Sequence, residues 1–230
     1  MTISASNMPA DVTTLPATQR VKLTEVFLSI QGEADAVGWP TVFVRLTGCP
    51  LRCGYCDTTY SFYGGEWHSL EDVLQTVSSH GVKHVCVTGG EPLSQQGCVP
   101  LLKALCDVGY AVSLETSGAI DISTVDSRVA RVVDLKTPGS GELKRNRYEN
   151  LPLLTAHDQV KFVLCDHADY EWARAQVREH QLNERCTVLF SPVHGQVNPR
   201  ELAEWILQDR LPVRLQVQLH KYLWGDERGR

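Results

Sequence analysis

The sequence predicts an α/β domain in which outer helices cover a parallel sheet, as an open sheet or an incomplete (partial) β/α barrel. Short, β-branched apolar segments alternate along the chain with amphipathic segments, which is typical of βα units. The strand candidates are apolar on both faces, as in a parallel sheet covered on both sides. A length of 230 residues suits one domain with a sizeable core.

The expected elements follow one another in a regular order. Strands are predicted over 22–30, 41–46, 84–89, 110–116, 131–136, 159–164 and 186–191. Helices are predicted over 69–81, 99–109, 168–180 and 198–209. Ser69 and Asp72 stand in capping-box spacing at the start of the first helix, and Gly81 and Gly109 end the first two. The last two helices carry apolar residues at three-to-four spacing.

Charge and composition exclude several classes of protein. With 22 Lys and Arg against 27 Asp and Glu, the net charge of −5 argues against a nucleic-acid partner. A hydrophobic content of 43% argues against disorder, and no apolar run approaches the ~18 residues of a membrane span. Residues 1–21 are polar, do not resemble a signal peptide and are expected to be a disordered tail before one catalytic domain over 22–230. We therefore expect a cytoplasmic protein with reduced thiols and no membrane partner.

Eight cysteines then need a role other than disulfide bonding. Free cysteine packs as a small buried hydrophobe, and five scattered cysteines are expected to do so. These five are Cys86, Cys98, Cys106, Cys165 and Cys186.

The other three cysteines, Cys49, Cys53 and Cys56, are packed into GCPLRCGYC directly after a predicted strand. A structural zinc site takes four protein ligands, and no second cysteine pair is present to complete one. A 4Fe–4S cluster held by three thiolates keeps one iron open for chemistry. The ligand count therefore favours a catalytic cluster, with a non-catalytic zinc-binding module as the alternative.

Polar residues and glycines follow several predicted strands. VTGGEP spans 87–92, ETSG spans 115–118, and Lys136 ends a further strand. The carboxyl ends of parallel strands meet at one edge of the sheet, so these residues are expected to gather there with the cysteine loop.

This arrangement resembles the radical S-adenosylmethionine superfamily. Cysteines at spacings x3 and x2 follow a strand, Tyr55 precedes the last cysteine, and a GGEP turn follows the next strand. The resemblance implies a partial β/α barrel of that type, with one 4Fe–4S cluster on Cys49, Cys53 and Cys56. It also implies S-adenosylmethionine bound to the open iron.

The segments 27–62, 115–118 and 219–225 (LHKYLWG) are further similar to the 7-carboxy-7-deazaguanine synthase family, and the resemblance extends over roughly 22–225. It implies a lyase that contracts 6-carboxy-5,6,7,8-tetrahydropterin to 7-carboxy-7-deazaguanine with release of ammonia, in the biosynthesis of deazaguanine tRNA bases such as queuosine. It also implies a homodimer, a magnesium ion, and flavodoxin or ferredoxin as electron donor.

Roles for individual residues follow from the same resemblance. The implied substrate contacts are Ile30, Gln31, Gly32, Glu33, Arg45, Thr88 and His220. The implied contacts to S-adenosylmethionine are Tyr55, Cys56, Asp57, Gly90, Glu91, Ser117, Asp134 and Lys136. Thr58 is the implied magnesium ligand, and the guanidinium of Arg45 suits the substrate carboxylate. Ala34 stands where the family often has glycine.

A second radical enzyme class, such as a glycyl-radical activase, shares the cysteine loop. Its partner is a protein, so QGEAD (31–35), Arg45 and LHKYLW (219–224) would have no evident purpose there.

Overall fold

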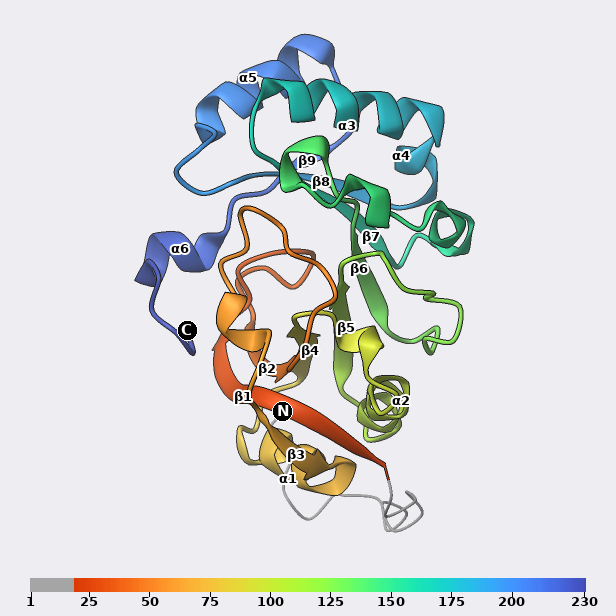
Figure 1. Cartoon of the computed structure of the whole chain (residues 1–230), viewed down its shortest axis with the longest axis vertical. Helices are drawn as coiled ribbons and strands as arrows, with labels where there is room; N and C mark the ends of the chain where they lie inside the picture. The colour runs from red at the N-terminus through yellow and green to blue at the C-terminus, as the bar shows by residue number, and fades with distance from the viewer. Residues whose placement is uncertain (1–18) are drawn as a thin grey trace.

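The computed structural model of the chain describes residues 19–230 and contains one nine-stranded sheet in the order β3-β1-β2-β4-β5-β6-β7-β8-β9 (Figure 1). The strands are β1 (Arg20–Ile30), β2 (Pro40–Leu46), β3 (Glu66–Ser69), β4 (His84–Gly89), β5 (Ala111–Thr116), β6 (Ala130–Asp134), β7 (Gln159–Leu164), β8 (Thr187–Pro192) and β9 (Arg214–Leu215). Most of the expected tail, residues 1–18, lies outside the described residues, and β1 already begins at Arg20.

The parallel sheet is confirmed from β2 onward, because each neighbouring pair from β2–β4 to β8–β9 is parallel. At one edge the sheet also has two antiparallel pairs, which the sequence analysis did not predict: β1 pairs antiparallel with β2, and β3 pairs antiparallel with β1. The loop 31–39 between β1 and β2 is too short for the crossover that parallel neighbours need. The sheet has separate edge strands at β3 and β9 and is therefore an incomplete barrel.

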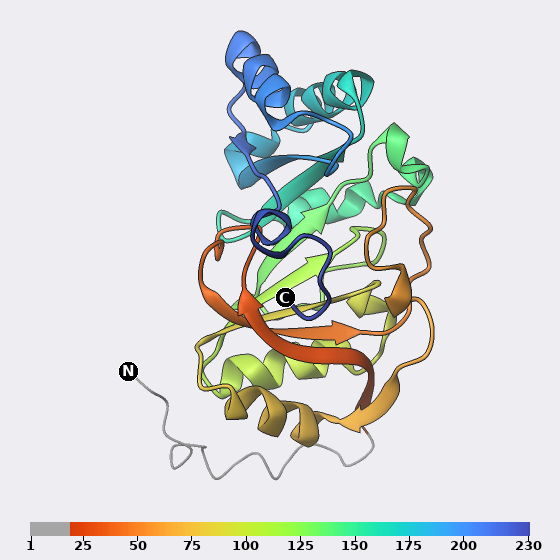
Figure 2. The ribbon, with the colours of Figure 1, turned by 90° about the vertical axis from the view of Figure 1, so that its left-hand side faces the viewer.

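Helices cover the outer face of this sheet (Figure 2). They are α1 (Leu70–Ser79), α2 (Cys98–Asp107), α3 (His167–Glu179), α4 (Leu182–Arg185) and α5 (Pro199–Asp209), whereas α6 (Leu219–Trp224) lies on the open side of the sheet. The predicted capping box starts α1: Ser69 Oγ accepts from the Asp72 N–H at 3.1 Å, and Asp72 Oδ2 accepts from the Ser69 N–H at 3.3 Å. Across residues 19–230, no helix combines the length and apolarity that crossing a membrane requires.

Four short elements escaped the sequence analysis, namely β3, β9, α4 and α6. Each is two to six residues long, below the length at which a periodic pattern can be recognised. The most consequential is α6, because it brings the C-terminal part of the chain back over the open side of the sheet (Figures 1 and 2).

Four of the five scattered cysteines pack as the predicted buried hydrophobes, and Cys165 does not. All eight cysteines are free, and Cys86, Cys98, Cys106 and Cys186 are buried in the core. Cys165 is only half-buried.

Candidate functional site

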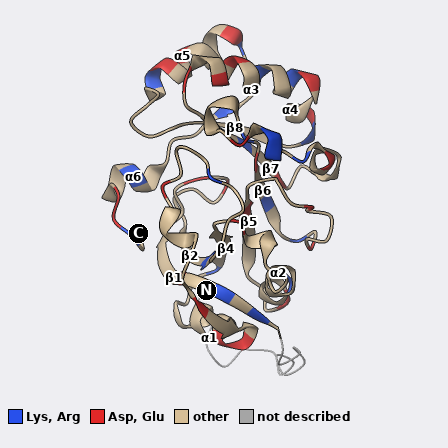
Figure 3. Cartoon of the chain, in the orientation of Figure 1, with Lys and Arg blue, Asp and Glu red and all other residues tan. Residues whose placement is uncertain are grey.

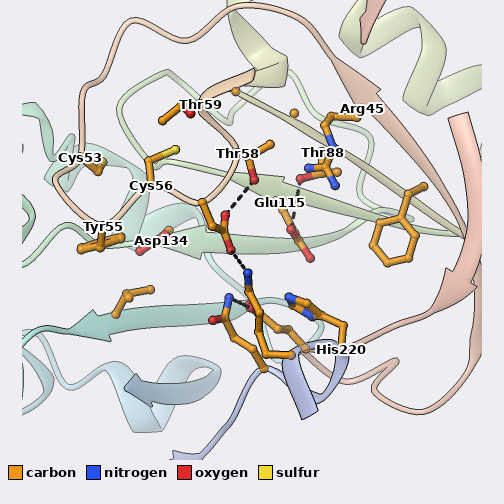
Figure 4. Close-up of a pocket in the computed structure, with 18 of the residues that line it drawn as sticks. Arg45, Cys53, Tyr55, Cys56, Thr58, Thr59, Thr88, Glu115, Asp134 and His220 are labelled. Carbon is orange, nitrogen blue, oxygen red and sulfur yellow. Dashed lines mark hydrogen bonds and ion pairs between the residues drawn. The ribbon is translucent and has the colours of Figure 1, made fainter. Parts of the chain in front are cut away.

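A cavity of about 670 Å³ lies at the carboxyl ends of the parallel strands (Figure 4). Its lining includes His220 and Lys221 of α6 and residues 225–230. Every residue predicted for the site lines this cavity except Gly32 and Glu91. The expected convergence at one edge of the sheet is therefore confirmed in the described part of the chain.

The cysteine loop is packed backbone to backbone against the GGEP turn. Gly89 has φ +151°, and a Cβ there would lie 2.1 Å from the Leu46 carbonyl oxygen. A Cβ on Gly90 would lie 2.3 Å from the Gly48 carbonyl oxygen and 2.6 Å from Cys49 Cβ. Both glycines are thus required sterically, and the Glu91 N–H donates to the Gly48 carbonyl at 2.8 Å to hold the two loops together.

All three thiols of this loop face the cavity and are free and half-buried. Burial raises the pKa of each thiol, that of Cys53 to about 11, so thiolate ligands here need the positive charge of bound iron. Within residues 19–230, no three Cys, His, Asp or Glu side chains converge on one point as ligands of a single ion would. Three soft thiolates spread along one loop fit a larger iron–sulfur cluster better than a single zinc ion.

Beside the thiols, the cavity wall carries two buried polar atoms without a hydrogen-bond partner: the Tyr55 hydroxyl and Asp134 Oδ1 (Figure 4). The other oxygen of Asp134 pairs with Lys136 Nζ at 2.7 Å, and that ammonium lies 5.8 Å from the centre of the Tyr55 ring. Buried polar atoms normally have partners, so a polar ligand is expected to supply the missing bonds. The predicted cofactor residues Tyr55, Asp134 and Lys136 are thus together and suited to a polar ligand beside the cluster.

Glu91 has a different place from the one expected. Its side chain is fully buried and accepts from the Thr116 hydroxyl at 2.9 Å, from the Leu93 N–H at 2.9 Å and from both the N–H and the hydroxyl of Ser117. With these donors already bound, the carboxylate ties the GGEP turn to the end of β5 and is not available to a ligand. Of the turn, Gly89 and Gly90 line the cavity, together with Thr116 and Ser117 at the end of β5.

Glu115, on β5, is a charged cavity residue that the sequence analysis did not single out. Its Oε2 accepts from the Thr88 hydroxyl at 3.1 Å, and its Oε1 lies 3.5 Å from Gln31 Nε2 (Figure 4). Two predicted substrate residues, Thr88 and Gln31, therefore converge on one carboxylate. The sequence feature that could have identified Glu115 is its position in ETSG, at the end of an apolar strand.

Glu33 belongs to a buried network that includes a second missed residue, Lys161. Glu33 pairs with Lys161 Nζ at 2.6 Å and accepts from Gln218 Nε2 at 2.9 Å. Burial alone would raise the pKa of Glu33, but the Lys161 ammonium lowers it below its usual range. A lone lysine inside the apolar strand QVKFVL was the signal for this site.

His220 lies against the turn that carries Glu33. A Cβ on Gly32 would lie 2.2 Å from His220 Nδ1, so glycine is needed for the close approach of α6. The Leu219 N–H donates to the Gly32 carbonyl at 3.1 Å and fixes this contact. Burial lowers the pKa of His220, which favours the neutral imidazole at pH 7.

Arg45 is half-buried rather than at the surface, as expected from its apolar strand. Its Nε donates to Glu25 Oε1 at 2.7 Å, and the Tyr60 hydroxyl donates to the same oxygen at 2.8 Å. The guanidinium thus enters the cavity with a protein carboxylate already beside it.

Thr58 lies close to the cysteine loop, where its hydroxyl donates to Asp57 Oδ1 at 2.8 Å. Asp57 Oδ2 lies 3.6 Å from Lys221 Nζ (Figure 4). Both oxygen-bearing side chains line the cavity beside Cys56.

The Lys161 ammonium should stabilise the fold through Glu33. Lys161→Met is expected to lower the free energy of unfolding by about 1–3 kcal/mol, because a buried carboxylate loses its charged partner. Thermal denaturation would measure this. Lys103→Met, which removes the exposed ion pair of Lys103 with Asp107 on α2, serves as the control. If Glu33→Gln combined with Lys161→Met is no more stable than Lys161→Met alone, the pair is not the cause.

Comparison with known proteins agrees with this geometry. The Radical SAM superfamily profile matches residues 43–208. The chain is 45% identical to the 7-carboxy-7-deazaguanine synthase of Chlorobaculum tepidum, over 91% of this chain and 97% of that protein. It is 43% identical to the 7-carboxy-7-deazaguanine synthase of Koribacter versatilis, over 90% of this chain and 98% of that protein.

Among solved structures, the crystal structure of QueE from Escherichia coli matches with a TM-score of 0.72 and 23% identity, covering 87% of this chain and 95% of that one. The same incomplete barrel is therefore present in both proteins.

Proposed function

The chain belongs to the 7-carboxy-7-deazaguanine synthase family of the radical S-adenosylmethionine superfamily, and on this premise we propose that it contracts 6-carboxy-5,6,7,8-tetrahydropterin to 7-carboxy-7-deazaguanine with release of ammonia. The observation that carries the proposal is one cavity that joins three cluster thiols to Glu115 and Arg45. The proposed enzyme is a lyase on the route to deazaguanine tRNA bases such as queuosine. We place it in the cytoplasm, where thiols stay reduced.

Membership of the superfamily implies a 4Fe–4S cluster and S-adenosylmethionine. When bound, they supply one-electron cleavage of the cofactor and a radical that takes a hydrogen atom from the substrate. We assign Cys49, Cys53 and Cys56 to the cluster, and Gly90, Ser117, Tyr55 and the Asp134–Lys136 pair to the walls that hold the cofactor. These residues position the reacting groups and exclude water.

The remaining polar groups suit the two ends of the substrate. The Glu115 carboxylate is an acceptor for the amino-pyrimidine edge, with Gln31 and Thr88 orienting it. Glu33 is held by Lys161 and Gln218, so it shapes this edge of the cavity. The guanidinium of Arg45 suits the substrate carboxylate. Neutral His220 completes the wall as a hydrogen-bonding group.

We place a magnesium ion at Thr58, where hydroxyl and carboxylate oxygens lie together. Magnesium prefers few protein oxygens and keeps several waters. Thr58→Ala should therefore weaken activity mildly and make it depend more steeply on added magnesium, because water can replace one oxygen ligand. Steady-state rates across a magnesium titration would measure this, with Thr76→Ala on the exposed face of α1 as control. A flat magnesium response in wild type freed of divalent ions would contradict the assignment.

For the electron donor we propose a small acidic protein, flavodoxin or ferredoxin. Exposed cations lie beside the cysteine loop: Arg52 within it, and Lys144 and Arg145 on the short turn Leu143–Arg145. Figure 3 draws the Lys and Arg residues of the described chain in blue. The loop and this region are adjacent, since the Gly54 N–H donates to the Ser140 carbonyl at 3.0 Å. Local positive charge on an acidic chain can steer such a donor to the cluster.

A homodimer is our proposal for the assembly. Leu28, Val37 and Trp39 are large apolar side chains exposed on β1 and the turn that follows it. Exposed apolar side chains, when they gather into a patch, often mark an interface. Sedimentation of wild type should give a dimer, and Leu28→Asp combined with Trp39→Asp should give a monomer.

An anaerobic assay of the reconstituted protein with 6-carboxy-5,6,7,8-tetrahydropterin tests the proposed function. One equivalent of S-adenosylmethionine should support many turnovers with little net 5′-deoxyadenosine. Product and deoxyadenosine in equal amounts would rule out a regenerated cofactor. Cofactor cleavage without any conversion of the pterin would favour a different radical enzyme, such as a glycyl-radical activase.

A further inference from the structure

Most charged side chains that line the cavity form ion pairs, either with one another or, for Arg45, with Glu25, which is not a lining residue. The pairs are Arg45–Glu25, Lys136–Asp134, Lys161–Glu33, Lys221–Asp57, Lys221–Asp226 and Arg230–Glu227. Among the charged lining residues that the structure describes, only Glu115 and Arg228 form no ion pair. The cavity thus presents one uncompensated carboxylate and one uncompensated guanidinium.

Arg228 is an exposed lining residue of the cavity, on the segment that follows α6. Its guanidinium carbon lies 4.1 Å from the centre of the Tyr60 ring. The segment is held in place by Lys221, which pairs with Asp226 at 2.6 Å and with Asp57 at 3.6 Å. A guanidinium over an aromatic ring keeps its N–H groups directed outward from the ring edge and free for a ligand.

Arg228 and Arg45 both lie close to the ring of Tyr60. The guanidinium carbon of Arg45 lies 5.9 Å from the Tyr60 ring centre, and the Tyr60 hydroxyl donates to Glu25, the partner of Arg45. Glu25 already neutralises the positive charge of Arg45. A substrate carboxylate that binds to Arg45 therefore needs a second cation to neutralise its own charge. Arg228, which forms no ion pair, is next to this pair because both it and Arg45 lie close to the Tyr60 ring.

We propose that Arg228 binds the carboxylate of the substrate together with Arg45, and that it selects carboxylated over uncarboxylated pterins. This inference rests on the proposed function and adds a binding residue to it. Two guanidiniums around one carboxylate give charge-assisted bonds from both sides, whereas Arg45 with Glu25 provides bonds without net charge.

The test compares wild type, Arg228→Ala and Arg228→Lys, with Arg200→Ala on α5 as a remote control, whose exposed partner is Glu204. Binding of 6-carboxy-5,6,7,8-tetrahydropterin and of 5,6,7,8-tetrahydropterin, which lacks the carboxylate, is measured anaerobically by calorimetry. For Arg228→Ala we expect the carboxylated pterin to bind about 10- to 100-fold more weakly, the loss of one charge-assisted contact. Arg228→Lys should recover part of the loss, and Arg200→Ala should match wild type. The uncarboxylated pterin should bind all four proteins alike.

Three results would overturn the assignment, and a fourth, binding without conversion, would overturn the proposed function alone. Equal affinity of wild type and Arg228→Ala for the carboxylated pterin would remove Arg228 from the site. Equal losses for both pterins would show that Arg228 only supports the segment. Wild type that binds the carboxylated pterin but does not convert it would overturn the proposed function and leave the binding assignment to be judged by the first two comparisons. Wild type that binds neither pterin would overturn both.

Discussion

Replacing Cys49, Cys53 or Cys56 with alanine is expected to abolish both the brown 4Fe–4S chromophore and all activity. Each thiol comes from the one loop that is packed against the GGEP turn, and no other cysteine lines the cavity in the described part of the chain. A cubane normally takes four thiolates, so a site with three has none to spare. Iron analysis and absorption spectra after anaerobic reconstitution would measure the loss.

Matched controls are available among the buried cysteines. Cys86→Ala and Cys98→Ala remove thiols that are fully buried in the core, and both variants should keep their iron. Cys165→Ala should keep it as well. If Cys86→Ala loses as much iron as Cys53→Ala, the assignment of three ligands from one loop is wrong.

Arg45→Ala is expected to lower kcat/KM by roughly 30- to 1000-fold, a loss on the order of 2–4 kcal/mol. The guanidinium is half-buried, and its removal deprives the substrate carboxylate of charge-assisted bonds. It also leaves Glu25 beside the cavity without its partner, which adds repulsion toward an incoming carboxylate. Steady-state kinetics with the carboxylated pterin would measure the effect at full iron content.

Glu25→Gln separates these two contributions. It keeps Arg45 and removes the competing charge, so its kcat/KM should stay far closer to that of wild type than that of Arg45→Ala. Added magnesium should not rescue Arg45→Ala, because the lost contact is not to the metal. Unaltered kinetics in Arg45→Ala would exclude this arginine from substrate binding.

Much of the fold was predictable because it depends on local patterns. Apolar β-branched runs and amphipathic segments determine the six parallel strands from β2 to β8 and their four main helices. The antiparallel pairing of β1 and β3 was not predictable, since strand direction depends on how a chain turns between elements. Elements such as β9 and α6 are too short to carry a pattern of their own.

The candidate site divides in the same way. Cysteine spacing and the GGEP run are contiguous in sequence, so the loop chemistry was evident from the residues alone. The partners of these residues were not evident. Glu91 was expected to contact the cofactor, but its carboxylate accepts hydrogen bonds from Thr116 and Ser117. This contact depends on the approach of β5 to β4, which the sequence does not reveal. The ion pairs of Lys161 with Glu33 and of Arg45 with Glu25 likewise join residues whose sequence positions say nothing of their contact.

A linear pattern reports which residue types are present and which side of a strand or helix they occupy. It does not report which charges are compensated, because compensation depends on distances of a few ångströms between segments far apart in the chain. The three thiols, the glycines and the barrel strands were therefore evident before folding was considered. The pairing that leaves Glu115 and Arg228 as the uncompensated charges of the cavity follows from the folded chain alone, because α6 returns the C-terminal segment to the mouth of a site built by β1 to β7.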